Sequence, residues 1–265
     1  MSNIVITGST KGIGFGLAQE FASRGHHVAI AGRTQQAIDD ALQRIGETPG
    51  NVIGQPCDVA DKAAVQALWD KAVATFGSVD IWINNAGLAR TTHKIIEYSS
   101  EDIQAMVNTN VLGTINGCQV AGAGMLEAGR GKIFNMLGGG SDGQYFPGMG
   151  IYGTTKRGLD YLTDAMIKEF KGTGVVIGKI RPGMVITEAV IREARFDLES
   201  FQSSRKVMNV LCDHVETVAP FLVDGILKAD TSGTKIAWLT GGKIGMRMMF
   251  SRFGKQEDKF ERYGL

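Results

Sequence analysis

The sequence lacks several features that would assign it to a protein class at once. Its 28 Lys and Arg residues are matched by 27 Asp and Glu residues, and a net charge of +1 does not favour a nucleic-acid binder. No apolar run reaches the roughly 18 residues that span a bilayer. No basic, apolar leader precedes the first expected strand, so we expect no secretory signal and a cytoplasmic protein.

Disulfide and metal chemistry are not indicated either. The three cysteines, Cys57, Cys118 and Cys212, are too scattered for a disulfide framework or for paired zinc ligands. The histidines, which show no metal-ligand spacing, are His26, His27, His93 and His214. We therefore expect no metal site, and we interpret the cysteines as small core residues in a reducing compartment.

What the sequence has is an ordinary globular composition, with 43% hydrophobic and 21% charged residues. Short β-branched runs alternate with segments whose apolar residues recur at helical spacing. This alternation predicts an α/β fold, a doubly wound parallel sheet with helices on both faces, in a single domain over residues 1–265. The seven strands are expected at residues 3–7, 27–31, 52–55, 81–83, 132–136, 175–180 and 236–239.

Two segments break the alternation. Residues 184–213 carry scattered apolar side chains and are expected to pass over the sheet edge on the substrate side. Residues 241–265 combine a basic excess with Met and Phe side chains. Packing of this tail on its own domain or on a sister subunit is the favoured interpretation, and contact with a membrane surface is the other.

A glycine-rich turn follows the first expected strand and opens a helix. Its spacing is G-x-x-x-G-x-G, and its glycines let backbone N–H groups approach a pyrophosphate at the positive end of that helix. A turn that binds nothing is the weaker interpretation. The dinucleotide contacts predicted here are Gly8, Thr10, Lys11, Gly12, Ile13 and Gly14.

The end of the second strand distinguishes the two nicotinamide dinucleotides. An NAD site places a carboxylate there for the ribose hydroxyls, whereas a 2′-phosphate requires a cation. This sequence has no acid at that point and offers Arg33 and Thr34, with Lys11 as a second positive charge. It therefore favours NADP(H) over NAD(H), unless Arg33 is merely solvated at the strand end.

Tyr152 and Lys156 are candidates for acid–base chemistry. They lie four residues apart at the start of an expected helix, on one face, after the fifth strand. An ammonium beside a phenol stabilises phenolate, so we expect Lys156 to lower the pKa of Tyr152 from about 10 toward neutrality. The pair alone is a weak signal, and its position favours catalysis over a surface pair.

Together these motifs resemble the short-chain dehydrogenase/reductase family, a Rossmann fold, over nearly the whole chain. Further matches are the Asp-Val after the third strand, the N-N-A-G turn after the fourth, the helix asparagine Asn110 and the P-G…T turn after the sixth. The cofactor contacts that the resemblance implies are Asp58, Val59, Asn85, Ala86, Gly87, Tyr152, Lys156, Pro182, Gly183 and Thr187. It also implies a homodimer or homotetramer built on the helices of Asn110 and Tyr152.

The catalytic serine departs from the family pattern. The family places it after the fifth strand, where this sequence has Gly139, and the nearest hydroxyl is Ser141. Three glycines before Ser141 can fold into a bulge that brings it to the usual place. We take Ser141 as the fourth catalytic residue, although a turn cap, or a site without a serine, stays open.

A narrower resemblance concerns the substrate. Residues 133–143, 182–187, 239–241 and 250–253 are similar to the plant chlorophyll b reductases, which reduce a formyl group on a large, flat, apolar ring. A bulky apolar carbonyl substrate is therefore expected, although a related chain can keep the scaffold and change the ligand.

The resemblance implies hydride transfer from NADPH to the carbonyl of a small-molecule substrate, with Tyr152 giving its proton to the oxygen. Ser141 would hydrogen-bond that oxygen, Lys156 would hold the nicotinamide ribose, and Asn110 would position a water that returns the proton. The alternative is a non-catalytic NADP(H)-binding redox sensor or interaction protein, which the missing serine favours and the retained Tyr152 and Lys156 disfavour.

Overall fold

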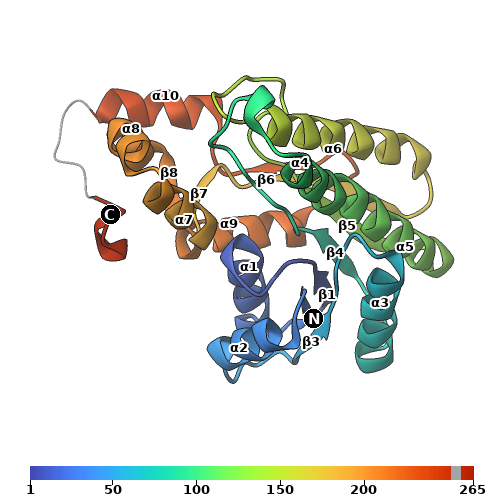
Figure 1. The fold of residues 1–265 in the computed structure, drawn as a ribbon. Helices are drawn as coiled ribbons and strands as arrows, with labels where there is room; N and C mark the ends of the chain where they lie inside the picture. The colour runs from blue at the N-terminus through green and yellow to red at the C-terminus, as the bar shows by residue number, and fades with distance from the viewer. Residues whose placement is uncertain (252–257) are drawn as a thin grey trace.

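A computed structural model describes residues 1–251 and 258–265 as one sheet wrapped by helices. The seven parallel strands lie in the order β3-β2-β1-β4-β5-β6-β9 (Figure 1). The strands are β1 Asn3–Ile6, β2 His27–Gly32, β3 Val52–Pro56, β4 Ile81–Asn84, β5 Gly131–Met136, β6 Val175–Arg181 and β9 Lys235–Ala237. The helices are α1 Gly12–Ser23, α2 Gln35–Ile45, α3 Lys62–Phe76, α4 Ser100–Met106, α5 Gly113–Ala128, α6 Gly150–Glu169, α7 Glu188–Phe196, α8 Leu198–Leu211, α9 Val215–Lys228 and α10 Gly241–Phe250.

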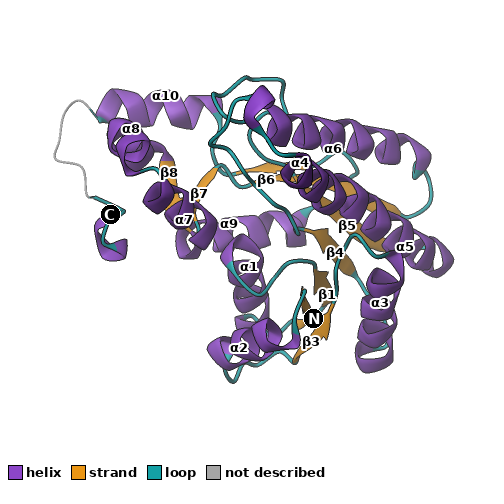
Figure 2. Ribbon diagram, in the orientation of Figure 1, coloured by secondary structure: helices purple, strands orange, loops and turns teal. Residues whose placement is uncertain are grey.

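The sheet is buried on both faces, which explains its continuous apolar strands. Ile4, Val5 and Ile6 of β1 are fully buried even though successive side chains point to opposite faces. One face packs against α1, α2 and α9, and the other against α3, α5 and α6 (Figure 2). The predicted seven-stranded, doubly wound fold is confirmed.

The strand order places a ligand crevice at a defined point. From β1 the chain builds outward through β2 and β3, and it then returns to add β4 on the other side of β1. At such a switch point the loops after the two central strands leave in opposite directions, and a crevice opens at their carboxyl ends. The loops after β1 and β4 carry the glycine turn and the N-N-A-G turn.

Residues 184–213 form a small unit of their own at the end of the sheet. Two three-residue strands, β7 Met184–Ile186 and β8 Cys212–His214, pair in parallel and enclose α7 and α8. A separate apolar cluster joins this unit to the tail through Phe260, which is fully buried and packs edge-on against Phe201. The expected passage over the sheet edge thus has regular structure that the sequence pattern did not indicate.

The tail divides into two described parts. Residues 258–265 pack on the chain's own domain, where Lys259 and Arg247 both contact the nearly buried Asp213. On α10 the basic side chains face inward, whereas Met249 and Phe250 are 52% and 64% exposed. The predicted tail residues Arg252, Phe253, Lys255 and Glu257 lie outside the described residues. Among the described helices none is long and apolar enough to cross a membrane.

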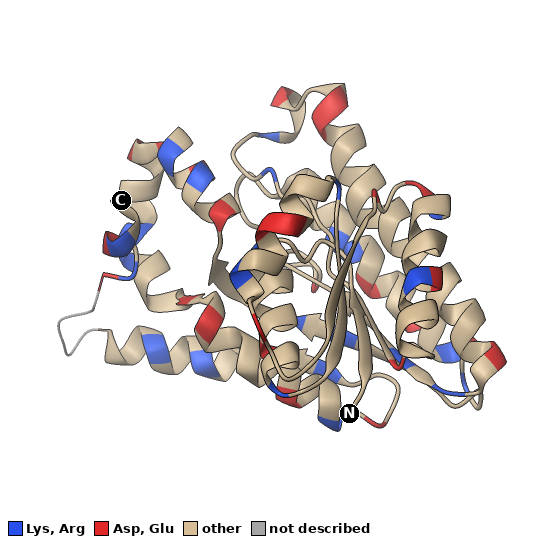
Figure 3. Ribbon diagram, turned by 90° about the horizontal axis from the view of Figure 1, so that it is seen from below, with Lys and Arg blue, Asp and Glu red and all other residues tan. Residues whose placement is uncertain are grey.

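The charged residues and the cysteines are placed as the balanced charge and the scattered cysteines of the sequence suggest. Lys and Arg are interspersed with Asp and Glu around the helices (Figure 3). All three cysteines are buried and unpaired, as expected of small core residues, and burial raises the pKa of the Cys57, Cys118 and Cys212 thiols to about 12.

Candidate active site

The glycine turn is held tightly against the N-N-A-G turn. Gly8 and Gly12 have positive φ angles of 61° and 58°, which favour glycine. A Cβ on Gly8 would lie 2.7 Å from the Cα of Ala86, so only a glycine allows this approach. The helix α1 begins at Gly12, and the cap residue Lys11 gives its first N–H groups no side-chain partner. These groups are therefore available to an anion.

Asn85 links the glycine turn to the N-N-A-G turn through its side chain, and its predicted contact with the cofactor stays a prediction. Its amide Nδ2 donates to the backbone oxygens of Thr7 and Gly8, both at 2.9 Å. The Thr7 hydroxyl in turn accepts from the backbone N–H groups of Asn85 and Ala86 at 3.0 Å. The Asn85 side chain is thus committed to joining the two turns, so its contribution to cofactor binding is to shape the crevice.

Gly14 offers a test of this arrangement. A Cβ there would overlap the Asn85 amide and lie 2.7 Å from the Gly8 oxygen. We expect Gly14→Ala to weaken NADPH binding and to cost about 1–3 kcal/mol in the free energy of unfolding, as overpacking does. Gly245→Ala is the matched control, because Gly245 is also helical and has nothing within 4 Å of its added Cβ. Calorimetric titration measures NADPH binding by each variant, and thermal unfolding measures its stability. Equal NADPH affinity and equal stability in the two variants would contradict the role given to Gly14.

The two predicted phosphate-binding cations are exposed at the entrance. Arg33 and Lys11 are exposed, and neither has an ion pair within residues 1–251 or 258–265. The Thr34 hydroxyl accepts from the Ala37 N–H at 3.3 Å and so caps α2. Thr10 packs its methyl group against Gly32 at the end of β2. The structure therefore leaves Arg33, Lys11 and the donor O–H of Thr34 available to a phosphate, since the cap uses only an acceptor site of the Thr34 oxygen.

The Asp-Val turn after β3 is placed with the same loops. The Asp58 side chain accepts from the Ala60 N–H at 3.0 Å, an Asx-turn, and remains exposed on one side. Val59 is buried against Gly113, and its oxygen accepts from Asn116. Asp58 can thus face an adenine, while Val59 contributes its backbone.

Tyr152 and Lys156 lie on one face of α6, as predicted, with Lys156 Nζ 5.7 Å from the Tyr152 ring centroid. The Tyr152 hydroxyl lies against Gly138 at the end of β5. Lys156 Nζ donates to the Met136 oxygen at 2.9 Å, and a Cβ on Gly87 would be 3.6 Å from it. The pair therefore borders the crevice between the loops after β4 and β5.

The predicted pKa of Tyr152 is wrong in direction. Burial, with the charge of Glu193 adding to it, raises the pKa of Tyr152 to about 12. Burial also lowers the pKa of Lys156 to about 8. Desolvation dominates because Lys156 directs its ammonium to the Met136 carbonyl and not to the phenol. The arrangement keeps the tyrosine protonated.

Asn110 is fully buried in a π-helical turn, 107–112, that continues α4 into α5. Its Oδ1 accepts from the Leu88 N–H at 2.7 Å, and its Nδ2 donates to the Leu88 oxygen and to Thr155. The amide is thus occupied in tying the loop after β4 to α6. Its water-positioning role stays a prediction, and its visible role is to fix the wall beside Lys156.

The three glycines before Ser141 form a turn, not the expected strand bulge. The Ser141 N–H donates to the Gly138 oxygen at 3.2 Å, and Gly140 has a φ of +83°. Ser141 is 2% exposed and follows directly on the turn whose first residue touches the Tyr152 hydroxyl. The structure therefore places Ser141 in the loop that contacts the Tyr152 hydroxyl through Gly138, and its catalytic role stays a prediction.

The turn after β6 closes the crevice from the far side. Gly183 has a φ of +78°, and Pro182 is buried. Thr187 starts α7, and its methyl group would be 3.5 Å from a Cβ on Gly12. A cavity of about 340 Å³ opens between α1 and this turn, lined by residues that include Gly12, Thr187 and Tyr263. Of the predicted nicotinamide-side residues, Thr187 thus faces the glycine turn, whereas Gly183 lies against Leu239.

The sequence analysis missed a carboxylate near Tyr152. Glu193 on α7 accepts from the Thr91 hydroxyl at 2.6 Å, which joins α7 to the loop after β4. A Cβ on Gly148 would clash with the Thr91 oxygen, so the loop before α6 meets them there. The two residues are separated by 102 positions, and no motif marks either.

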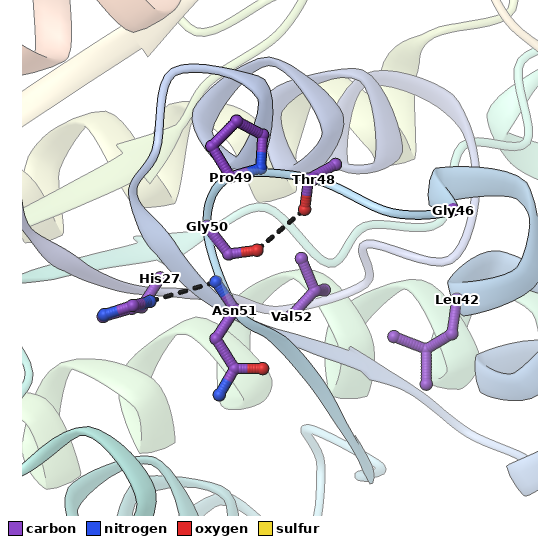
Figure 4. Close-up of a pocket in the computed structure, with 8 residues that line it drawn as sticks. All are labelled: His27, Leu42, Gly46, Thr48, Pro49, Gly50, Asn51 and Val52. Carbon is purple, nitrogen blue, oxygen red and sulfur yellow. Dashed lines mark hydrogen bonds between the residues drawn. The ribbon is translucent and has the colours of Figure 1, made fainter.

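A second hollow lies away from this chemistry. It has a volume of about 500 Å³ and is bordered by His27, Leu42, Thr48 and Val52 (Figure 4). His27 and Val52 are the first residues of β2 and β3, so the hollow lies at the amino ends of these strands. The crevice lies at the opposite, carboxyl ends of the strands. Its polar groups are satisfied locally, as the Asn51 N–H donates to His27 Nδ1 at 3.0 Å.

Comparison with known proteins decides the family. The model of the short chain dehydrogenase family matches residues 2–197. The chain belongs to the short-chain dehydrogenase family. It is therefore an oxidoreductase that binds NAD(P)(H).

Relatives and solved structures agree with this membership. The short-chain dehydrogenase is 38% identical to chlorophyll(ide) b reductase NOL of Arabidopsis thaliana, with 94% of this chain and 73% of that one covered. It is 32% identical to the probable chlorophyll(ide) b reductase NYC1 of the same plant, covering 91% of this chain and about half, 51%, of that one. The solved structure of ElxO with NADP bound has a TM-score of 0.79 and 26% identity, with 92% of this chain and 99% of that chain covered.

The residues present fit the dinucleotide. The N–H groups at the start of α1 are available for the pyrophosphate. Gly87 brings the loop after β4 next to two polar groups, since a Cβ there would be 3.6 Å from both the Lys156 ammonium and the Asn110 Oδ1. Lys156 keeps two further donors beyond its bond to Met136.

Proposed function

We propose that this short-chain dehydrogenase is an NADPH-dependent reductase of an aldehyde or ketone on a bulky apolar substrate. The observation that carries the proposal is the placement of a protonated Tyr152 beside the buried Lys156, at the edge of a dinucleotide crevice. A carbonyl reductase needs an acid, and a phenol whose pKa lies at about 12 is in its acid form at neutral pH.

The mechanism uses three side chains around the carbonyl. A reduced nicotinamide, when bound, supplies the hydride that forms the new C–H bond. Tyr152 gives its proton to the carbonyl oxygen as that oxygen gains negative charge, so a hydroxyl is formed and a phenolate remains. Ser141 donates a hydrogen bond to the same oxygen, and the Lys156 charge stabilises the phenolate. The phenolate regains its proton from solvent.

NADP(H) is the preferred dinucleotide under this proposal. Arg33 follows the end of β2 and Lys11 lies in the loop after β1; both are exposed cations, and the described chain offers no ion-pair partner to either. A 2′-phosphate suits a guanidinium fork and an ammonium. The NADP-bound ElxO structure shares this fold at 26% identity.

The substrate class rests on relatives and on exposed apolar groups. The NOL and NYC1 relatives are named as chlorophyll(ide) b reductases, and the formyl group is the carbonyl that this resemblance implies. On the loop before α6, Tyr145 and Phe146 are 76% and 42% exposed, and Met184 at the start of β7 is 40% exposed. These side chains give a large apolar ring surfaces on which to pack.

The assay that tests the function is direct. NADPH absorbance is followed with aldehydes, ketones and quinones of increasing apolar size, including formyl-bearing tetrapyrroles. Turnover that rises with apolar size supports the proposal. NADPH binding without turnover of any carbonyl would instead favour the non-catalytic redox sensor.

The pH dependence of reduction is a further expectation. Because burial lowers the pKa of Lys156 to about 8, its charge is present below that pH and is lost above it. Tyr152 stays protonated throughout this range, since its pKa is about 12. We therefore expect kcat/KM for carbonyl reduction to fall as the pH rises through about 8, with Lys156→Arg removing the fall. A flat profile up to the tyrosine pKa would contradict the role of the Lys156 charge.

We also propose a homodimer or homotetramer built on the helices of Asn110 and Tyr152. Apolar side chains stand exposed there, with Leu112 at 40% and Leu126 at 44%. Light scattering measures the number of subunits in the assembly.

A cytoplasmic location stays a prediction, and the NOL relative is named as chloroplastic.

A further inference from the structure

Ser141 lies in a stretch of backbone that its own sequence leaves loose. Gly138, Gly139 and Gly140 precede it, and Gly143 follows two residues later. Glycine has more conformational freedom than any other residue, so four glycines around two other residues do not define one position by themselves. A serine that must direct its hydroxyl at a reacting oxygen needs external supports here.

Two consecutive turns give the local geometry. The first closes from the Ser141 N–H to the Gly138 oxygen at 3.2 Å, and the second from the Gly143 N–H to the Gly140 oxygen at 3.0 Å. Ser141 and Asp142 are the two central residues of the second turn. Contacts that fix the side chain of Asp142 therefore also restrict the backbone angles of the turn next to Ser141.

Asp142 is held by the sheet. Its Oδ2 pairs with Arg181 Nη2 at 2.7 Å, and its Oδ1 accepts from the Gln144 N–H at 3.2 Å. Burial opposes the charge of Asp142, but the bonds from Arg181 and Gln144 outweigh it and lower its pKa. Arg181 is itself the last residue of β6, where its oxygen accepts from Trp238. The pair thus connects the turn to the rigid end of the sheet.

A second arginine contacts the serine itself. Arg157, on α6 five residues beyond Tyr152, donates to the Ser141 backbone oxygen at 3.0 Å and pairs with Asp160 at 3.3 Å. The Arg157 side chain is 60% exposed, so this contact is screened more than the Arg181 pair, whose side chains are 23% and 28% exposed. Arg181 and Asp142 are therefore the stronger support.

We propose that Asp142 and Arg181 are positioning residues that hold Ser141 in place toward the carbonyl, where they replace the rigidity that the glycine turn lacks. The inference rests on the proposed carbonyl reduction. Neither residue contacts the substrate. Their effect passes through the Ser141 hydroxyl and requires it.

The test is a double-mutant cycle measured on the NADPH-saturated protein. Asp142→Asn keeps the size of the side chain and removes its charge, and we expect it to lower kcat about tenfold with an unchanged KM for NADPH. Ser141→Ala should lower kcat by about 10²-fold, the typical effect of losing an oxyanion donor. In the double variant, Asp142→Asn should add nothing, because no hydroxyl remains to be positioned.

Controls separate the possible failures. Asp224→Asn breaks another Asp–Arg pair, at 2.5 Å to Arg24 between α9 and α1, and should leave kcat unchanged. Arg181→Met removes the other member of the pair. If Asp142→Asn is poorly folded, Arg181→Met should show the same loss of kcat in its place. A wild-type chain that reduces no carbonyl would overturn the proposed function. A fully active Ser141→Ala would leave carbonyl reduction standing and would overturn the role of Ser141, and with it the positioning role. Loss of kcat that is as large in the Ser141→Ala background as in the wild type overturns only the positioning role.

Discussion

Tyr152→Phe should lower kcat for carbonyl reduction by roughly 10²–10⁴-fold, the usual contribution of a positioned general acid. Phenylalanine keeps the ring that packs against Gly138 and lies 5.7 Å from Lys156 Nζ, and it removes only the proton donor. The Lys156 bond to the Met136 oxygen does not involve the phenol, so the crevice should keep its shape. NADPH affinity and thermal stability are therefore expected to stay near the wild-type values.

The measurement pairs initial rates with calorimetric titration of NADPH. Tyr161→Phe is the matched control, because Tyr161 lies on the same helix, is 77% exposed and should be dispensable for turnover. A Tyr152→Phe chain that keeps wild-type kcat would remove the acid from the mechanism. Equal losses in both variants would indicate damage to α6 and not to the chemistry.

The fold was predictable because its signals are local and repeated. Each central strand is a short apolar run buried on both faces, and the segments between them have apolar residues at helical spacing, so the seven strands of the main sheet follow from the chain. The pair β7–β8 was not predictable, since three residues per strand carry no period. Cys212 and Met184 meet only because α7 and α8 bring β8 back to β7.

The site was predictable where a motif implies a backbone shape. Gly8 and Gly12 have the positive φ angles that the glycine turn requires, and Tyr152 and Lys156 share one face of α6, while their roles stay predictions. The sense of the Tyr152 pKa shift was not predictable, because spacing along a helix gives proximity but not desolvation. The same limit applies to the bond of Thr91 to Glu193, which joins residues far apart in sequence.

Arg33→Asp should reverse the dinucleotide preference. The substitution removes the cation that we assign to the 2′-phosphate and places a carboxylate where a ribose hydroxyl can be bound. A charge-assisted bond is worth about 1.5–3 kcal/mol, so we expect NADPH affinity to fall roughly 10–100-fold. NADH affinity should rise, since its free 2′-hydroxyl can donate to the new acid. Thr34 is left in place because its hydroxyl caps α2.

A control is needed because Arg33 can act in two ways. It can bind the 2′-phosphate directly, or it can attract the negatively charged dinucleotide through its charge alone. Lys71→Asp changes the net charge by the same amount on the exposed surface of α3, and it should leave the ratio of NADPH to NADH affinities unchanged. Titrations at low and high salt refine the test, because a screened long-range effect weakens with salt more than a bonded contact does. If Arg33→Asp and Lys71→Asp lower NADPH affinity equally, Arg33 is only solvated at the end of β2. The preference for NADP(H) would then have to arise from Lys11 or from the rest of the crevice.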